Sequence, residues 1–152
     1  MLNTLTVSFF GHRYIENVFE IEDRVEHVLK DLVQSNDYVE ILVGRNGDFD
    51  ILVASAVNRL KRQIGKENLS LVWVQPYIQI EYTKNTDEFD GYYDSVEVCE
   101  KSAKSHFKSA IQTRNRYMID RSDLVVCFTK VKGGAYSSRQ YAQKRGKTII
   151  DI

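Results

Sequence analysis

The sequence predicts an α/β fold, in which helices cover both faces of a doubly wound, mainly parallel five-stranded sheet. Short apolar runs rich in β-branched residues alternate along the chain with longer segments whose apolar residues recur at helical spacing. Parallel neighbours in a sheet need crossover connections, and the helices that supply them cover its two faces. The length of 152 residues, with 43% hydrophobic residues, suits one domain over residues 1–152.

Five short apolar runs are the predicted strands. The run at 124–128 is the clearest, because its five residues are all apolar or aromatic, as is typical of a strand buried on both faces of a parallel sheet. The predicted strands span residues 5–10, 39–43, 69–74, 124–128 and 148–152.

Helical periodicity fills most of the segments between these runs. Apolar residues recur at helical spacing over residues 21–32 and 53–64. A third helix is predicted from about residue 101 to 119, with Phe107, Ile111, Arg114 and Met118 on one stripe, and a fourth follows the Gly133-Gly134 pair.

Residues 77–98 differ from the rest, because acidic and aromatic residues mix there without a sustained period. Such a stretch is either a lid over a binding site or a surface excursion, since long loops in compact domains are often functional. The aromatic residues at 89–93 could also serve the interface of a homodimer.

Charge and composition exclude several classes of protein. The 21 basic residues balance the 21 acidic ones, whereas a general binder of nucleic acid or membrane surfaces normally has a basic excess. No apolar stretch approaches the length of a membrane span. With only Cys99 and Cys127 present, we expect free thiols and a cytoplasmic protein.

Glycine-containing loops follow three of the predicted strands. They lie at residues 11–13, 44–50 and 133–134. Ligands of doubly wound folds bind outside the carboxyl ends of the strands. The helix that follows Gly134 offers unpaired N–H groups and the positive end of its dipole, with Ser137 or Ser138 as additional donors, so the loops predict a site for an anion such as phosphate.

Two arginines are candidates for binding that anion. Arg114 falls on the apolar stripe of its helix, where a charge is costly unless it is paired. It serves either a structural ion pair or, together with Arg13, the oxygens of a phosphate or carboxylate.

Each of the other polar residues of the loops has two possible roles, one in ligand binding and one in the structure. His12 could contact a phosphate or a ribose hydroxyl, or be structural. Asn46, Asp48 and Asp50 could bind ribose hydroxyls or a base edge, although an Asp at a helix start is often only a cap. Tyr136 could stack on a base or merely pack.

Common cofactor and catalytic motifs are absent from the sequence. The three histidines are scattered, and neither cysteine has a nearby ligand partner, so no metal site is expected. The Walker loop, the dinucleotide fingerprint after the first strand and the Gly-x-Ser-x-Gly elbow are also missing, and no cofactor is expected.

Four motifs occur in a particular order along nearly the whole chain. They are Phe9-Phe10-Gly11-His12-Arg13; Gly44 to Asp50; Arg114-Asn115 with Met118-Ile119 and Ser122-Asp123; and Gly133-Gly134-Ala135-Tyr136 leading to Tyr141-Ala142. Together they resemble the Rossmann-like SLOG superfamily, which includes the DNA-processing protein of natural transformation and the Lonely Guy phosphoribohydrolases. The similarity is greatest to its small, single-domain bacterial and phage members.

The resemblance implies a nucleotide or nucleotide-derived ligand at the strand ends. In the hydrolases of this superfamily, a Pro-Gly-Gly-x-Gly-Thr-x-x-Glu motif binds phosphate and supplies a carboxylate. Here Lys132, Tyr136 and Gln140 stand in place of the proline, the third glycine and the glutamate. An amide cannot act as a general base, so hydrolysis would need Asp48 or Asp50 as the catalytic carboxylate.

The leading hypothesis is therefore binding of a nucleoside phosphate or an ADP-ribose-like ligand, for sensing or sequestration. The alternative is an N-glycosidic hydrolase of nucleoside monophosphates, and a third is a module for single-stranded DNA, which the zero net charge disfavours. The expected partners are the small nucleotide-like ligand and a second copy of the chain in a homodimer. The candidate ligand-binding residues are Gly11, His12, Arg13, Gly44, Asn46, Gly47, Asp50, Arg114, Asn115, Gly133, Gly134, Tyr136 and Ser137.

Overall fold

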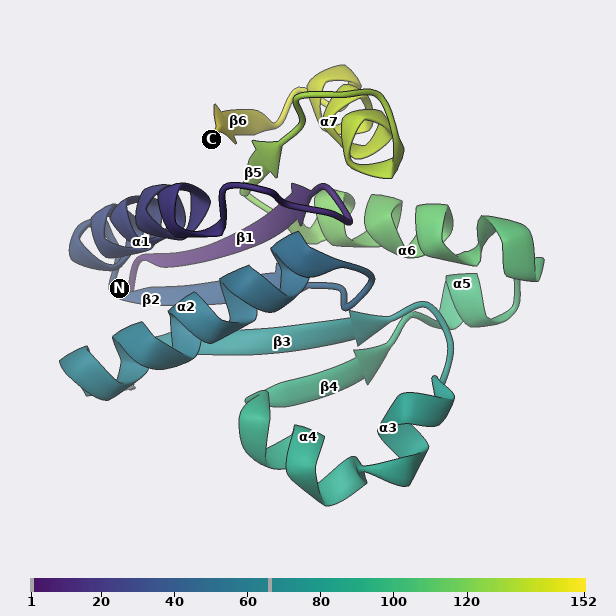
Figure 1. Cartoon of the computed structure of the whole chain (residues 1–152), viewed down its shortest axis with the longest axis horizontal. Coiled ribbons are helices and arrows are strands. Elements are labelled where there is room, and N and C mark those ends of the chain that lie inside the picture. Colours follow the sequence, from purple (N-terminus) through teal and green to yellow (C-terminus); the bar gives the residue numbers. More distant parts are fainter. Residues whose placement is uncertain (1, 66) are drawn as a thin grey trace.

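A six-stranded parallel sheet is the centre of the molecule (Figure 1). The structure is a computed structural model that describes residues 2–65 and 67–152. The strand order is β4-β3-β2-β1-β5-β6, and each of the five neighbouring pairs is parallel. The strands are β1 (Thr4–Gly11), β2 (Tyr38–Val43), β3 (Leu69–Gln75), β4 (Ser95–Val98), β5 (Leu124–Phe128) and β6 (Thr148–Asp151).

Helices pack on both faces of this sheet. The core on one face joins the sheet to α1 and α2, and the core on the other joins it to α6 and α7. Consecutive residues of β1 divide between them, since Phe9 belongs to the first core and Phe10 to the second. The helices are α1 (Val18–Ser35), α2 (Asp48–Ile64), α3 (Ile80–Lys84), α4 (Thr86–Tyr92), α5 (Glu100–Ala103), α6 (Phe107–Arg121) and α7 (Gly134–Lys144).

The direction in which strands are added to the sheet changes at β1. From β1 the chain adds β2, β3 and β4 on one side, and then crosses to place β5 and β6 on the other. Near their carboxyl ends β1 and β5 are in register, with Gly11 opposite Phe128. The loops that leave these two strands lead to helices on opposite faces, and such a point in a parallel sheet leaves a crevice at the strand ends.

The sixth strand corrects the prediction of five. Residues 77–98 contain α3, α4 and the edge strand β4, not a continuous loop. β4 has only four residues, none of them fully buried, so it lacks the apolar run that identified the other strands. Asp94 fixes its start, because its carboxylate accepts the N–H of Leu71 at 2.7 Å and pairs with Lys61.

An aromatic cluster attaches this segment to the sheet. The rings of Tyr82, Phe89 and Tyr93 lie 5.8, 5.2 and 5.3 Å from the ring of Trp73, which is fully buried in β3. The guanidinium of Arg45, in the loop after β2, lies 4.9 Å from the Phe89 ring centroid and donates to the Tyr93 hydroxyl at 3.1 Å. The cluster therefore connects residues 77–94 to the β2–α2 loop.

The helix predicted over 101–119 is interrupted. It consists of α5 and α6, and His106 caps α6 by accepting the N–H of Lys108 at 3.1 Å. Phe107 is 72% exposed, so its place on a buried stripe is wrong, whereas Arg114 and Met118 of that stripe are buried. Phe107 therefore fits the helical spacing of the apolar stripe, but it is not buried at the first turn of α6.

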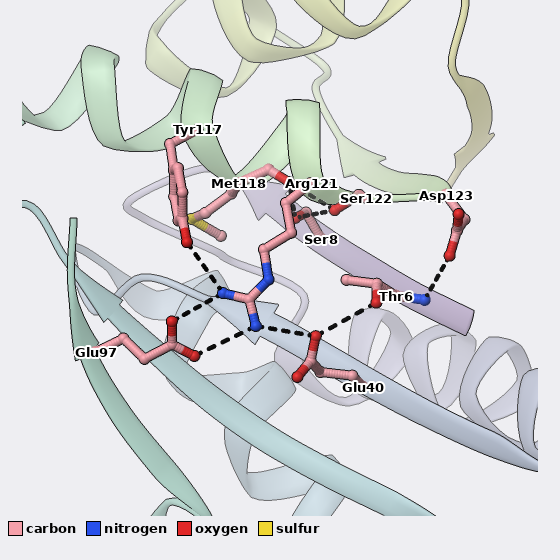
Figure 2. A network of polar contacts seen from close by, with 9 residues as sticks. All are labelled: Thr6, Ser8, Glu40, Glu97, Tyr117, Met118, Arg121, Ser122 and Asp123. Carbon is pink, nitrogen blue, oxygen red and sulfur yellow. Dashed lines mark hydrogen bonds and ion pairs between the residues drawn. The ribbon is translucent and has the colours of Figure 1, made fainter. Parts of the chain in front are cut away.

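A polar network holds the end of α6 on the sheet (Figure 2). Arg121 donates to Glu97 of β4 at 2.8 Å and to Glu40 of β2 at 3.1 Å, and Glu40 also accepts the hydroxyl of Thr6. Nearby, the hydroxyls of Ser8 and Ser122 lie 2.6 Å apart. Since α6 is pinned at this end, Arg114, about two turns earlier on the same helix, is held over the carboxyl ends of the strands.

Within the two described ranges, no helix combines the length and the apolar character that a membrane crossing requires.

Candidate functional site

A pocket of about 650 Å³ opens at the carboxyl ends of β1, β2 and β5. Its wall consists of the loops that follow these three strands, together with the start of α7 and the middle of α6. A volume of this size is within the range of small-molecule sites in proteins. The three loops that were expected at one edge of the sheet therefore meet around a common space.

Eleven of the candidate residues line this pocket, and three do not. Asp48 is exposed, and its carboxylate accepts the N–H of Ile15 at 3.1 Å, which is a structural role. Ser137 lines a smaller neighbouring cavity of about 250 Å³ between α6 and α7, and Tyr136 lines neither cavity. The lining candidates are Gly11, His12, Arg13, Gly44, Asn46, Gly47, Asp50, Arg114, Asn115, Gly133 and Gly134.

Arg114 is a buried cation in the pocket wall. Only 2% of the residue is exposed, and its guanidinium donates to Val74 O at 2.7 Å, to Asn46 Oδ1 at 2.6 Å and to Asn115 Oδ1 at 2.8 Å. All three acceptors are neutral, and within residues 2–65 and 67–152 it forms no ion pair. Burial accordingly lowers the pKa of Arg114, and the more distant Asp50 opposes this only in part.

Asp50 is the carboxylate nearest to that charge. It lies in the first turn of α2, and its Oδ2 accepts the backbone N–H of Asn46 at 2.9 Å. Burial raises the pKa of Asp50, while the Asn46 N–H and the charges of Arg114 and Arg45 act in the opposite direction. The pocket wall thus contains a carboxyl group, of Asp50, and a guanidinium, of Arg114, that compensate each other's charge only in part.

Two glycines of the site are required by packing, and a third lies in close contact with Arg114. A Cβ on Gly11 would lie 2.1 Å from Cγ of Phe49, and one on Gly47 would lie 2.5 Å from the Cα of Arg13. A Cβ on Gly44 would lie 3.0 Å from both terminal nitrogens of Arg114, so this guanidinium lies against bare backbone. These absent side chains let the loops and Arg114 approach one another.

The glycines at the start of α7 face open space. A Cβ on Gly133 or Gly134 would meet nothing within 4 Å. No side chain caps α7, whereas the first N–H groups of α2 donate to Arg13 O at 2.8 Å and to His12 O at 3.4 Å. The amino end of α7 is therefore accessible from the pocket.

Lysines of the β5–α7 loop are pocket residues that the sequence reasoning missed as ligand donors. Lys130 and Lys132 both line the pocket and are exposed. In the described part of the chain, Arg13 and these two lysines take part in no ion pair. With Arg114 the lining has four cationic side chains against the carboxylates of Glu16 and Asp50, so the pocket is positive in a chain of zero net charge. Their position between the fourth predicted apolar run and the glycine pair was the available signal.

His12 holds this loop in place. Its Nε2 accepts the backbone N–H groups of Lys130 at 2.7 Å and Val131 at 3.2 Å, and its ring packs edge-on against Phe128. Because Nε2 is an acceptor, the ring is neutral with its proton on Nδ1. Burial lowers the pKa of His12 below its usual 6.5. The structure therefore favours the structural reading of His12.

The arrangement of His12 predicts a pH dependence. A group whose pKa is lowered by folding contributes stability that is present above its ordinary pKa of 6.5 and is lost as the pH falls through the lower folded value. The thermal unfolding midpoint should therefore decrease as the pH is lowered below about 6.5. In His12→Gln, whose amide oxygen can accept the same N–H groups without titrating, that fall should be smaller, whereas the exposed His27→Gln should retain it. Equal pH profiles for the two variants would contradict the assignment.

The lid interpretation of residues 77–98 is not supported, because none of them lines either cavity. Among residues 2–65 and 67–152, no group of three His, Cys, Asp or Glu side chains is placed to hold a metal ion.

Fold and pocket define a class: an α/β protein with a ligand-sized, positively charged pocket at the carboxyl ends of a parallel sheet. No protein-family model matches the chain, and no curated protein matches it.

Proposed function

We propose that this chain binds a nucleotide or a nucleotide-derived ligand, such as a nucleoside phosphate or an ADP-ribose-like molecule, for sensing or sequestration. The observation that carries the proposal is Arg114, a buried guanidinium in the pocket wall that has only neutral partners within the described residues. A buried cation without a counter-charge is costly, and an anionic group in the pocket would offset that cost.

The surroundings of Arg114 support an anion with phosphate character. The open amino end of α7 supplies backbone donors, and Arg13, Lys130 and Lys132 add positive charge at the same pocket. The proposal includes membership of the SLOG superfamily and a Rossmann-like, doubly wound fold. The change of direction between β1 and β5, with the pocket at that point, supports this part.

Asp50 favours a second candidate, hydrolysis of the N-glycosidic bond of a nucleoside monophosphate. It is a pocket carboxylate whose pKa is raised by burial, and such a group can exchange a proton closer to neutral pH. Gln140, in the place of the family glutamate, is exposed on α7 and lines neither cavity, so Asp50 would have to supply the catalytic carboxylate.

Binding of single-stranded DNA has less support. Two arginines of α6 are not available to contact a phosphate backbone, since Arg114 is buried and Arg121 pairs with Glu40 and Glu97. A cytoplasmic location and a homodimer remain parts of the proposal, the former supported by two buried free cysteines and the latter testable by sedimentation.

Calorimetric titration of the purified protein with AMP, ADP, ADP-ribose, NAD and inorganic phosphate tests the proposed function. We expect saturable binding of at least one nucleotide, and a loss of roughly 10- to 100-fold in its affinity in Arg114→Met, as for a charge-assisted interaction. The control is Arg116→Met, which changes an exposed arginine of the same helix outside the larger pocket. Absence of binding across the panel would overturn the proposal.

The hydrolase candidate is tested by its product. Incubation with nucleoside monophosphates should release free base only if the chain is a hydrolase. In that case Asp50→Asn should abolish release while the nucleotide still binds. Equal turnover in Asp50→Asn would exclude Asp50 as the catalytic group.

A further inference from the structure

The side-chain amide of Asn46 has a fixed orientation. Its Oδ1 accepts Nη2 of Arg114 at 2.6 Å. A guanidinium has only donors, so the oxygen of the amide must face Arg114 and the NH2 group must face away from it. Asn46 lines the pocket, and within the described residues its Nδ2 has no hydrogen-bond partner.

The guanidinium of Arg114, which orients Asn46, is itself fixed by several contacts. Its Nη1 also donates to Val74 O and its Nε to Asn115 Oδ1, and its guanidinium lies against the backbone of Gly44. A lysine could supply the charge at this place but not three divergent bonds in one plane. Arg114 therefore acts on the pocket partly through the orientation that it imposes on Asn46.

Asp50 presents the complementary atom beside it. Its Oδ2 is bonded to the backbone N–H of Asn46, and its Oδ1 has no partner within residues 2–65 and 67–152. Both side chains line the pocket, and neither this oxygen nor Asn46 Nδ2 belongs to the fully sealed, unpaired polar atoms of the described residues. The floor next to α2 thus offers one donor and one acceptor.

This pair cannot serve the phosphate, because a carboxylate repels it. A hydroxyl both donates and accepts, so two adjacent hydroxyls fit a carboxylate oxygen and an amide NH2. The cations Lys130 and Lys132 lie on the loop after β5, whereas Asn46 and Asp50 follow β2, and β1 separates the two strands. The pocket therefore has two exposed lysines on its side toward α7 and the Asn46–Asp50 pair on its side toward α2, and the buried Arg114 is bonded to Asn46 of that pair.

We propose that Asn46 and Asp50 bind the vicinal hydroxyls of the ligand's sugar, and that Arg114 is the positioning residue that turns the Asn46 amide toward them. The inference rests on the proposed function and adds two things to it. The ligand carries ribose in preference to deoxyribose, and it lies with its phosphate toward α7 and its sugar toward α2.

The test is the ratio of affinities for AMP and 2′-deoxy-AMP, measured by calorimetric titration. For the unchanged protein we expect AMP to bind roughly 10-fold or more tightly, since the deoxy compound leaves a pocket group unpaired. In Asn46→Ala the ratio should fall close to one. Asn85→Ala, in a residue outside both cavities, is the matched control and should keep the full ratio.

Arg114→Lys separates positioning from charge. We expect it to keep most of the affinity for 2′-deoxy-AMP, because the cation remains, and to lose the preference for AMP, because Asn46 is released. A purely structural role of Arg114 would lower both affinities alike and keep the ratio, which would overturn the positioning assignment.

The outcomes distinguish this inference from the proposed function. Equal binding of AMP and 2′-deoxy-AMP by the unchanged protein, or an unchanged ratio in Asn46→Ala, overturns the inference and leaves nucleotide binding intact. Failure of every nucleotide in the panel to bind overturns both.

Discussion

Gly11→Ala is expected to lower the free energy of unfolding by about 3 kcal/mol, at the upper end of the range for overpacked cores. The added Cβ would fall 2.1 Å from Cγ of Phe49, a distance that no real contact allows. Phe49 cannot withdraw, since it is fully buried and its ring stacks on that of Phe128 at 5.9 Å. Urea unfolding followed by circular dichroism measures the loss.

Gly134→Ala is the matched control for this substitution. A Cβ there meets nothing within 4 Å, so the free energy of unfolding should change by less than about 0.5 kcal/mol. If Gly11→Ala were equally mild, the packing of the β1 end against α2 would differ from that described.

Arg121→Met is expected to cost about 2 kcal/mol of stability, a value reduced for the partial exposure of the network. Methionine retains much of the side-chain volume but removes the donors that hold Glu40 and Glu97. The side chains of Glu40 and Glu97 are only 26% and 33% exposed, and both carboxylates would be left without a counter-charge beneath α6. The same urea experiment measures the effect.

Arg145→Met serves as its control. The ion pair of Arg145 with Asp120 is far more exposed, with 56% and 42% of the two side chains accessible, so its loss should cost less than about 0.5 kcal/mol. Similar losses in the two variants would mean that the Arg121 network contributes no more than a surface ion pair.

Strands buried on both faces were predictable from the sequence. The inner strands β1, β2, β3 and β5 each coincide with a predicted apolar run, because burial on two faces leaves few polar positions to interrupt it. The fifth predicted run coincides with β6, an edge strand whose adjacent Ile149 and Ile150 are only partly buried. β4 escaped prediction because its two valines alternate with Ser95 and Glu97 and form no apolar run, so that its identity depends on pairing with β3 and on the anchoring of Asp94. Such contacts between distant residues leave no local pattern.

The sequence predicted which loops form the candidate site, but not the hydrogen-bond partners of the polar side chains in it. Parallel topology brings the loops after β1, β2 and β5 together, and the burial of Arg114 followed from its place on an apolar stripe. Its neutral partners could not be inferred, since they come from β3, the β2–α2 loop and α6 itself. The acceptor role of His12 also depends on a loop more than a hundred residues away.

The aromatic cluster on β3 contains a fluorophore whose emission can be measured without a label. Trp73 is the only tryptophan, fully buried, and the guanidinium of Arg45 lies 6.0 Å from its ring. Arg45 directly precedes Asn46 in the loop that lines the pocket, so movement of that loop on ligand binding would change the electric field at the single indole. Intrinsic fluorescence at one emission band would then report occupancy of the pocket without any added label.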